Sequence, residues 1–268
     1  MKHVLAERDL KLTKSLGQNF LHDQNQLRRI VRAAEVGSTD KILEIGPGLG
    51  PLTELLIEKA AEVLAIEKDE RLFDYLSQKF ASVAHLKLLH ADAMEYLKSH
   101  RQWREWKLVA NLPYSVASPL LVELAQAEEP PARMTATLQL EVAQRIAAPA
   151  GSEHFGVLGL LVGLRYEARD WFKIPAGCFF PAPEVDSACI VLSRRPEELL
   201  PPALHETFNR IVKRGFSQRR KMMFKLLKQD WPEAALQAAF ERVGLPPRTR
   251  AEEVSLEQFA RLTDTLSP

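Results

Sequence analysis

The chain has 268 residues with a formal net charge of +1, of which 46% are hydrophobic and 26% are charged. That length supports one sizeable hydrophobic core and a smaller one, so we expect one or two domains, and no apolar run approaches the roughly 18 residues of a membrane span. The two cysteines, Cys178 and Cys189, are too few for a disulfide framework and the seven histidines show no metal-ligand spacing, so we expect free thiols and no metal. Residues 1–14 contain no hydrophobic signal region, which predicts a cytoplasmic protein.

The first segment with a structural signal is Lys14-Ser-Leu-Gly-Gln-Asn-Phe-Leu21. It mixes a glycine with polar and aromatic residues, which suits a loop that folds over a bound ligand. Asp23 then predicts the start of a helix, because the apolar residues after it are spaced i, i+3, i+4 and i+7: Leu27, Ile30, Val31 and Ala34. Gly37 predicts the end of this helix.

A short apolar strand next runs into the glycine-rich turn of Lys41-Ile-Leu-Glu-Ile-Gly46-Pro-Gly48-Leu-Gly50. A strand, a glycine turn and a helix in this order are typical of the opening of a nucleotide-binding α/β domain. The dinucleotide fingerprint requires glycine or alanine at the position that Pro51 occupies. The sequence therefore disfavours a pyrophosphate ligand.

Carboxylates follow the next two predicted strands. The run from Val63 to Ile66 ends on Glu67, which can accept hydrogen bonds from both hydroxyls of a ribose, and the third run ends near Asp92. Either carboxylate alone can be a surface group at the end of a strand. Together, after a glycine turn, they favour a ligand that carries adenosine and an amino acid without phosphate, which is S-adenosylmethionine. Because its sulfonium makes the methyl group electrophilic, no strong base is required.

Asn111-Leu112-Pro113-Tyr114 stands directly behind an apolar run and predicts a pocket for an aminated base. The exocyclic amine of adenine is a poor nucleophile, so an enzyme that alkylates it needs acceptors for the N–H groups, and Asn111 and the carbonyl of Leu112 can supply them. Pro113 has no N–H that competes, and Tyr114 can stack on a base that has left its helix. The alternative interpretation is a strand followed by a turn.

Strands and helices alternate through Leu43, Ile66, Leu88, Val109 and Leu138, the pattern of a doubly wound and mostly parallel sheet in the α/β class. Residues 171–175 and 188–192 predict an antiparallel edge of that sheet. From residue 201 onward the pattern is helical, with Pro246 and Pro247 between helices. We therefore predict a ligand-binding domain over residues 1–198 and a helical domain over residues 199–268.

Two further segments are candidates for contact with nucleic acid. Phe179-Phe180-Pro181-Ala182-Pro183 places an aromatic pair at a rigid turn, where one ring clamps a base against Tyr114 or packs in the core. Residues 210–228 contain eight basic residues and no acidic one, which predicts contacts with a phosphate backbone, a solvated helix face being the alternative. The basic residues expected to bind RNA are Lys213, Arg214, Arg219, Arg220 and Lys221.

Over nearly its whole length the chain closely resembles the KsgA-type small-subunit ribosomal RNA adenine dimethyltransferases. The resemblance rests on Gly17-Gln-Asn-Phe-Leu21, Glu44-Ile-Gly-Pro-Gly-Leu-Gly50, Glu67, Asp92, Asn111-Leu-Pro-Tyr114, Phe179-x-Pro-x-Pro-x-Val-x-Ser187 and Gln218-Arg-Arg-Lys221. It implies a Rossmann-like methyltransferase domain and the transfer of two methyl groups to N6 of each of two adjacent adenines near the 3′ end of 16S rRNA, during assembly of the 30S particle. It further implies a cofactor site of Asn19, Leu21, Gly46, Gly48, Glu67, Asp92 and Asn111, and a catalytic site of Asn111, Leu112, Pro113, Tyr114 and Phe179.

The sequence departs from the family pattern at Ser115 and Lys225, where asparagine is usual, and at Gly159 and Gly163, which we expect to leave extra room beside the sheet. Two other functions stay open. One is the related large-subunit adenine methyltransferase class that confers macrolide resistance, and the other is a non-catalytic RNA-binding assembly factor. No unambiguous apolar patch indicates a dimer, so we expect a monomer.

Overall fold

The computed structural model describes residues 18–218 and 220–267. Gly17 and Arg219, to which roles are predicted, lie outside the described residues, as does the beginning of the predicted 14–21 loop. The chain forms two compact units, one made of the described residues up to 143 with residues 167–194, and one made of residues 144–166 with those from 195 onward. The division into residues 1–198 and 199–268 stays a prediction, and the compact units differ from it by grouping residues 144–166 with the C-terminal helices.

A seven-stranded sheet forms the centre of the first unit, in the order β4-β3-β2-β5-β6-β9-β7. The strands are β2 (Lys41–Ile45), β3 (Glu62–Glu67), β4 (Leu86–His90), β5 (Trp106–Asn111), β6 (Arg133–Gln139), β7 (Tyr166–Ile174) and β9 (Ser187–Arg194). The pairs β2–β3, β2–β5, β3–β4 and β5–β6 are parallel, whereas β6 and β9 pair antiparallel. The predicted mostly parallel sheet with an antiparallel partner near its edge is therefore confirmed.

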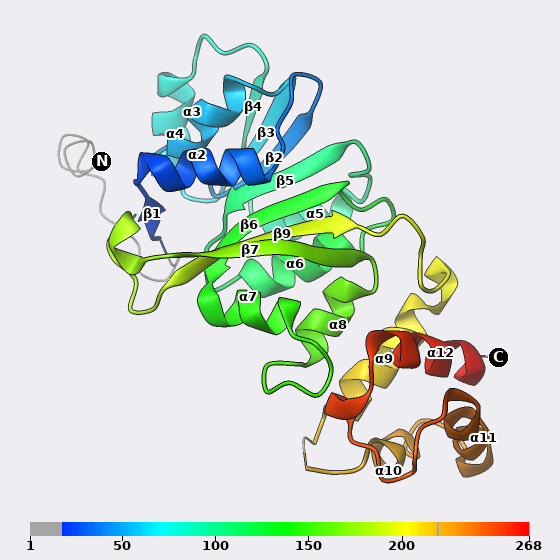
Figure 1. Cartoon of the computed structure of the whole chain (residues 1–268). Coiled ribbons are helices and arrows are strands. Elements are labelled where there is room, and N and C mark those ends of the chain that lie inside the picture. The colour runs from blue at the N-terminus through cyan, green and yellow to red at the C-terminus, as the bar shows by residue number, and fades with distance from the viewer. Residues whose placement is uncertain (1–17, 219, 268) are drawn as a thin grey trace. The chain divides into compact units, whose positions relative to one another are not determined.

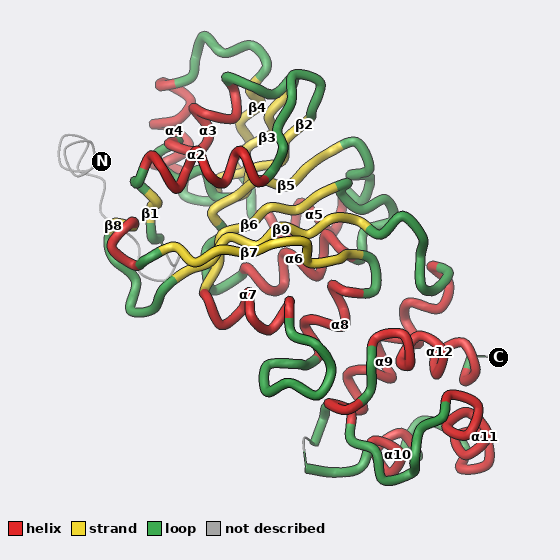
Figure 2. The backbone as a smooth tube through the Cα atoms, in the orientation of Figure 1, coloured by secondary structure: helices red, strands yellow, loops and turns green. Residues whose placement is uncertain are grey.

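Helices cover both faces of this sheet, as Figures 1 and 2 show. They are α2 (Gln24–Ala33), α3 (Pro51–Ile57), α4 (Glu70–Lys79), α5 (Ala93–Ser99) and α6 (Ala117–Ala125), with α7 (Leu140–Ala147) at the border of the two units. Ile42, Val63 and Val109 point to one face and share a hydrophobic cluster with α2 and α3. No described helix is long and apolar enough to cross a membrane.

Helix α2 begins as predicted, because the Asp23 carboxylate accepts a hydrogen bond from the backbone N–H of Gln26 at 2.9 Å. Its predicted end at Gly37 is wrong. The helix ends at Ala33, and the chain reverses through Glu35, which takes a left-handed φ of 50°. Gly37 instead donates its backbone N–H to Asp40 at 2.7 Å, in the turn that leads into β2.

A two-stranded sheet lies beside the main one and joins two distant segments. Strand β1 (Phe20–Leu21) pairs antiparallel with β8 (Phe179–Phe180), so that Phe20 is opposite Phe180 and Leu21 is opposite Phe179. A 3-10 turn, η2 (Ala176–Cys178), leads into β8. This pairing ties the predicted N-terminal loop to the segment rich in proline and aromatic residues.

The second unit is helical, as predicted for the C-terminal part of the chain. It contains α8 (Val157–Gly163), η3 (Pro202–Leu204), α9 (His205–Gly215), α10 (Met223–Leu227), α11 (Glu233–Val243), η4 (Ala251–Glu253) and α12 (Leu256–Leu266). Phe208, Phe240 and Phe259 are fully buried in it, one each from α9, α11 and α12. Helix α11 ends at Val243, and its C-cap Gly244 has a left-handed φ of 76°, two residues before the predicted Pro246–Pro247 break.

The glycine turn generates a prediction about stability. Gly50 has a φ of 80°, and a Cβ atom there would lie 2.8 Å from Phe80 and 3.0 Å from Leu76. Gly46 in the same turn has a φ of 69°, but a Cβ atom there would meet Pro113 at an ordinary 3.5 Å. We expect Gly50→Ala to lower the free energy of unfolding by about 1–3 kcal/mol more than Gly46→Ala, since only the first adds overlap to the backbone strain.

Denaturant unfolding of both variants in the absence of any ligand measures this difference. Gly46→Ala serves as the matched control for the left-handed backbone. Equal destabilisation by the two substitutions would show that the crowding against α4 does not contribute.

Candidate functional site

The first unit contains a cavity of about 190 Å³ at the carboxyl ends of its central strands. Such an edge, where the strand order changes direction, is where open α/β sheets bind ligands. The cavity is lined by nine of the predicted site residues: Asn19, Gly46, Gly48, Glu67, Asp92, Asn111, Leu112, Pro113 and Tyr114. Gln18, Lys68 and Ser115 also line it, so the departure at Ser115 lies in the site itself.

The floor of the cavity is the glycine turn after β2. Gly46 and Gly48 both have left-handed φ values, 69° and 63°, which glycine adopts without strain. The Gly46 N–H donates to the carbonyl of Ile66 at 2.9 Å, which holds the turn beside β3. A Cβ atom at Gly48 would come within 2.6 Å of the Phe20 ring, so only glycine lets the N-terminal segment approach this closely.

Glu67 is buried at the end of β3, and its carboxylate is oriented by the backbone. One oxygen accepts from the Gly48 N–H at 3.1 Å, and the other accepts from the Asp69 N–H at 2.9 Å. Burial raises the pKa of Glu67, and these backbone hydrogen bonds oppose the rise. Because each carboxylate oxygen has a further lone pair, both can also accept from a hydroxyl in the cavity.

Asp92 has two roles at the end of β4. Its Oδ1 accepts from the N–H groups of Met94 at 2.8 Å and Glu95 at 3.4 Å, so Asp92 is the N-cap of α5. Its Oδ2 accepts from Lys68 Nζ at 2.7 Å, and this hydrogen bond is the main cause of the lowered pKa of Asp92. Asp92 is therefore an ionised acceptor at the cavity wall.

Asn111 is the last residue of β5 and lines the cavity. Its Nδ2 donates to the carbonyl of Asn19 at 3.0 Å, which leaves Oδ1 pointing away as an acceptor. That Oδ1 is buried and has no hydrogen-bond partner among the described residues. A buried acceptor without a partner is costly unless a ligand donates to it. It is the clearest sign that a donor group belongs in this cavity.

The segment after Asn111 holds an aromatic ring in place. The Tyr114 hydroxyl lies 2.5 Å from the hydroxyl of Ser187, at the start of β9, and burial raises the pKa of Tyr114. The Val116 N–H donates to the Pro113 carbonyl at 3.1 Å and closes the turn. Tyr114 thus lines the cavity as a neutral, positioned ring.

Two predicted site residues do not line the cavity. Leu21 and Phe179 are opposite each other in the β1–β8 pair, and both belong to the hydrophobic cluster under α2. They are 1% and 2% exposed. Their predicted contacts with cofactor and adenine stay predictions, and the structure gives them a packing role.

The four described residues predicted to bind RNA, Lys213, Arg214, Arg220 and Lys221, belong to the second unit. Arg220 and Lys221 line a cavity of about 360 Å³ together with Met222, Lys225, Arg248 and Arg250. The sequence analysis did not predict Arg248 and Arg250 as candidates for RNA binding, because they lie after the Pro246–Pro247 break and outside the basic segment 210–228. The basic segment also has counter-ions beyond its end, since Arg214 pairs with Asp230 and Lys228 pairs with Glu233.

The expectation of extra room at Gly159 and Gly163 is wrong. A Cβ atom at Gly159 would lie 2.8 Å from the backbone carbonyl oxygen of Arg145, and one at Gly163 would lie 3.3 Å from Leu256. All four residues belong to the second unit. These glycines therefore permit close packing of α8 and leave no space.

Among the described residues, no group of three or more His, Cys, Asp or Glu side chains could hold a metal ion.

Comparisons with known proteins agree on one family. A family model described as ribosomal RNA adenine dimethylase matches residues 9–267. The protein named ribosomal RNA small subunit methyltransferase A of Latilactobacillus sakei subsp. sakei is 38% identical over 277 residues, covering 99% of this chain and 93% of that protein. Its namesake in Clostridium botulinum is 35% identical, with coverages of 99% and 98%.

Solved structures show the same fold. The 23S rRNA methyltransferase ErmE superposes with a TM-score of 0.71 at 28% identity, over 92% of this chain and 99% of that one. A dimethyladenosine transferase from Plasmodium falciparum has a TM-score of 0.76 at 22% identity, over 91% and 95% of the two chains.

A buried carboxyl group beneath the site predicts a dependence of stability on pH. Glu44 accepts a hydrogen bond from the Thr53 hydroxyl at 2.7 Å, and burial raises its pKa from 4.5 to about 8. Between these values the folded protein holds the proton that the unfolded chain has released, so the free energy of unfolding falls as the pH rises from 4.5 to about 8. We expect Glu44→Gln to flatten this fall, measured as the thermal unfolding midpoint across that range.

Glu58→Gln removes an exposed glutamate of the same unit and is the control, which should keep the wild-type profile. Parallel profiles for the wild type and Glu44→Gln would mean that Glu44 is not protonated in the folded protein.

Proposed function

The chain belongs to the ribosomal RNA adenine dimethylase family, and from this premise we propose that its cavity binds S-adenosylmethionine and transfers methyl groups to N6 of two adjacent adenines near the 3′ end of 16S rRNA. The observation that carries the proposal is the buried Asn111 Oδ1, an acceptor without a partner among the described residues that shares one cavity with Glu67 and Asp92. We propose that the substrate is an assembling 30S particle and that the protein meets it in the cytoplasm as a monomer.

The residues of the cavity fit this cofactor. Glu67 presents two oriented carboxylate oxygens for the ribose hydroxyls, and Asp92 presents an ionised acceptor at the next strand end. Gly46 and Gly48 keep the turn open beneath the Asn19 segment. When bound, S-adenosylmethionine supplies an electrophilic methyl group, so the protein contributes orientation and a polarised acceptor rather than a strong base.

The protein's own contribution to reaction at the adenine comes from the segment that starts at Asn111. Asn111 Oδ1 and the Leu112 carbonyl would accept hydrogen bonds from the N6 amine, which concentrates electron density on that nitrogen and stabilises the positive charge that develops there. Pro113 has no N–H to repel the amine. The Tyr114 ring, fixed through Ser187, would stack on a base that has left its helix.

We further propose that the second unit binds the phosphate backbone. Arg220, Lys221, Lys225 and Arg248 line its cavity, and none of them forms an ion pair with a described residue. Of the residues predicted for this role, Lys213 stands on α9 while Arg214 is held by Asp230. The cationic cavity is therefore a better candidate than the α9 face.

The direct test is methyl transfer from labelled S-adenosylmethionine to under-methylated small subunits and, in parallel, to large subunits, with mass spectrometry of the modified nucleoside. We expect dimethyladenosine only in small-subunit RNA. We expect Asn111→Ala to abolish transfer, because it removes both the acceptor and the hydrogen bond to Asn19, and to leave RNA binding intact.

Asn25→Ala, at an exposed position of α2, is the matched control and should transfer normally. Label in the large subunit would favour the macrolide-resistance class. The similarity to the 23S rRNA methyltransferase ErmE is the observation that favours this alternative. Retained transfer by Asn111→Ala would contradict the assignment of the site.

A second test addresses the cationic cavity. Combining Arg220→Gln, Lys221→Gln and Arg248→Gln should weaken binding to small-subunit RNA. It should also make the negative slope of log affinity against log salt shallower, by about one for each phosphate that the protein no longer neutralises. Filter binding across a salt series measures both quantities. Lys228→Gln removes the same charge from a lysine that is already paired with Glu233, so it should change neither of them. An unchanged slope in the triple variant would exclude this cavity as the RNA-binding surface.

A further inference from the structure

The Gln18–Asn19 dipeptide lines the cavity, and two of its hydrogen bonds join it to other elements. Gln18 Nε2 donates to Asp69 Oδ2 at 3.1 Å, and the Asn19 carbonyl accepts from Asn111 Nδ2 at 3.0 Å. The two anchors belong to different elements, since Asp69 is the N-cap of α4 and Asn111 ends β5. Both residues of the dipeptide line the cavity, so their position determines its shape on this side.

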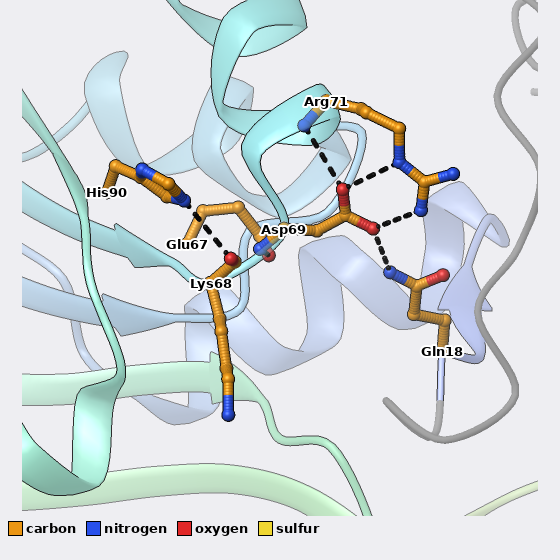
Figure 3. Close-up of polar contacts among 6 residues, drawn as sticks. All are labelled: Gln18, Glu67, Lys68, Asp69, Arg71 and His90. Carbon is orange, nitrogen blue, oxygen red and sulfur yellow. Dashed lines mark hydrogen bonds and ion pairs between the residues drawn. The ribbon is translucent and has the colours of Figure 1, made fainter.

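Asp69 is well suited to be the more rigid of these anchors. Its side chain is only 5% exposed, and its carboxylate accepts from the Arg71 backbone N–H at 3.1 Å, from Arg71 Nε at 3.0 Å and from Arg71 Nη2 at 2.7 Å. The Arg71 guanidinium is the main cause of the lowered pKa of Asp69. Figure 3 shows the carboxylate between the Arg71 and Gln18 side chains. It is thus an ionised acceptor whose direction is fixed by a forked partner.

The backbone of the same residue contacts a second group that lines the cavity. The Asp69 backbone N–H donates to Glu67 Oε1 at 2.9 Å, and Glu67 is the last residue of β3. One residue therefore contacts both the carboxylate proposed for the ribose and the Gln18 side chain of the dipeptide that lines the cavity. Neither hydrogen bond brings the Asp69 side chain into the cavity, since Asp69 does not line it.

From these contacts we infer that Asp69 is a positioning residue for cofactor binding, which acts through Gln18 to hold the Gln18–Asn19 dipeptide against the cavity. This inference rests on the proposed function, because it takes S-adenosylmethionine as the ligand. A segment that is already ordered loses less conformational freedom when a ligand binds. Removal of the Gln18–Asp69 hydrogen bond therefore weakens cofactor affinity, while turnover at saturating cofactor stays near the wild-type value.

A charge exchange across this hydrogen bond tests the inference. Gln18→Glu places a second carboxylate against Asp69, and we expect it to weaken cofactor binding by about tenfold, within the range of coupled neighbouring residues. Asp69→Asn in the same chain restores an N–H donor opposite the new carboxylate and still caps α4, so the double variant should return to within about threefold of the wild type. The readouts are the dissociation constants of S-adenosylmethionine and S-adenosylhomocysteine for the full-length protein by calorimetry, with kcat and KM for the cofactor beside them.

Two further variants keep the test decisive. Gln18→Ala removes the hydrogen bond without adding charge, and Asp69→Asn should then cause no additional decrease in affinity. Asp23→Asn is the matched control, because Asp23 caps α2 with the same kind of hydrogen bond but does not line the cavity, so its cofactor constants should equal those of the wild type.

The outcomes separate the two proposals. A wild-type protein that does not bind S-adenosylmethionine would overturn the proposed function and this inference with it. Normal wild-type binding together with unchanged constants in Gln18→Glu and Gln18→Ala would overturn only the role of Asp69, as would a double variant no better than Gln18→Glu. Rescue by the double variant, with kcat unchanged throughout, supports it.

Discussion

The parallel pairing of β2 with both β3 and β5 is the constraint on which the rest of the site depends. Parallel strands end at the same edge of a sheet, so the glycine turn, Glu67 and Asn111 meet there although they come from separate parts of the chain. The register supports this, because Ile45 is opposite Ile66 and continues into the Gly46 hydrogen bond to the same strand. The glycine turn, Glu67 and Asn111 therefore take their positions from these three strands, and Asp92 follows β4, which pairs parallel with β3.

The site is also defined by which of its polar groups are already occupied. Glu67 and Asp92 accept backbone N–H groups that fix their direction, and the hydroxyl of Tyr114 is held by Ser187. Only the Asn111 amide keeps a buried oxygen without a partner among the described groups of the cavity. A ligand that offers a hydrogen-bond donor to this oxygen removes the cost of an unsatisfied buried acceptor, whereas the oxygens of Glu67 already have backbone partners.

Much of the fold and of the site could be predicted from the sequence, because the signals are local. A strand, a glycine turn and carboxylates after successive strands indicated the parallel sheet and the cavity wall, and Asp23 marked the start of α2. The partners of these groups could not be predicted, since they lie far along the chain, as with Tyr114 and Ser187 or Gln18 and Asp69. The prediction of extra room at Gly159 was wrong for a related reason. The sequence shows that Gly159 has no side chain, but it does not show that the Arg145 backbone carbonyl occupies the space a side chain would need. Arg248 was not predicted to bind RNA, because it lies far from Arg220 and Lys221 in the sequence and meets them only in the folded unit.

The pairing of β1 with β8 has a consequence for the order of events during synthesis. Phe20 and Phe180 are about 160 positions apart, so the early strand waits for its partner while most of the first unit is made. At about 5–20 residues per second, that delay is on the order of ten seconds. Until then the segment beside Asn19 lacks its strand partner and Tyr114 lacks Ser187. The ribosome therefore makes β2, β3 and β5 well before β8 and β9, so the contacts that hold Phe20 and Tyr114 beside the cavity form only when nearly three quarters of the chain has been synthesised.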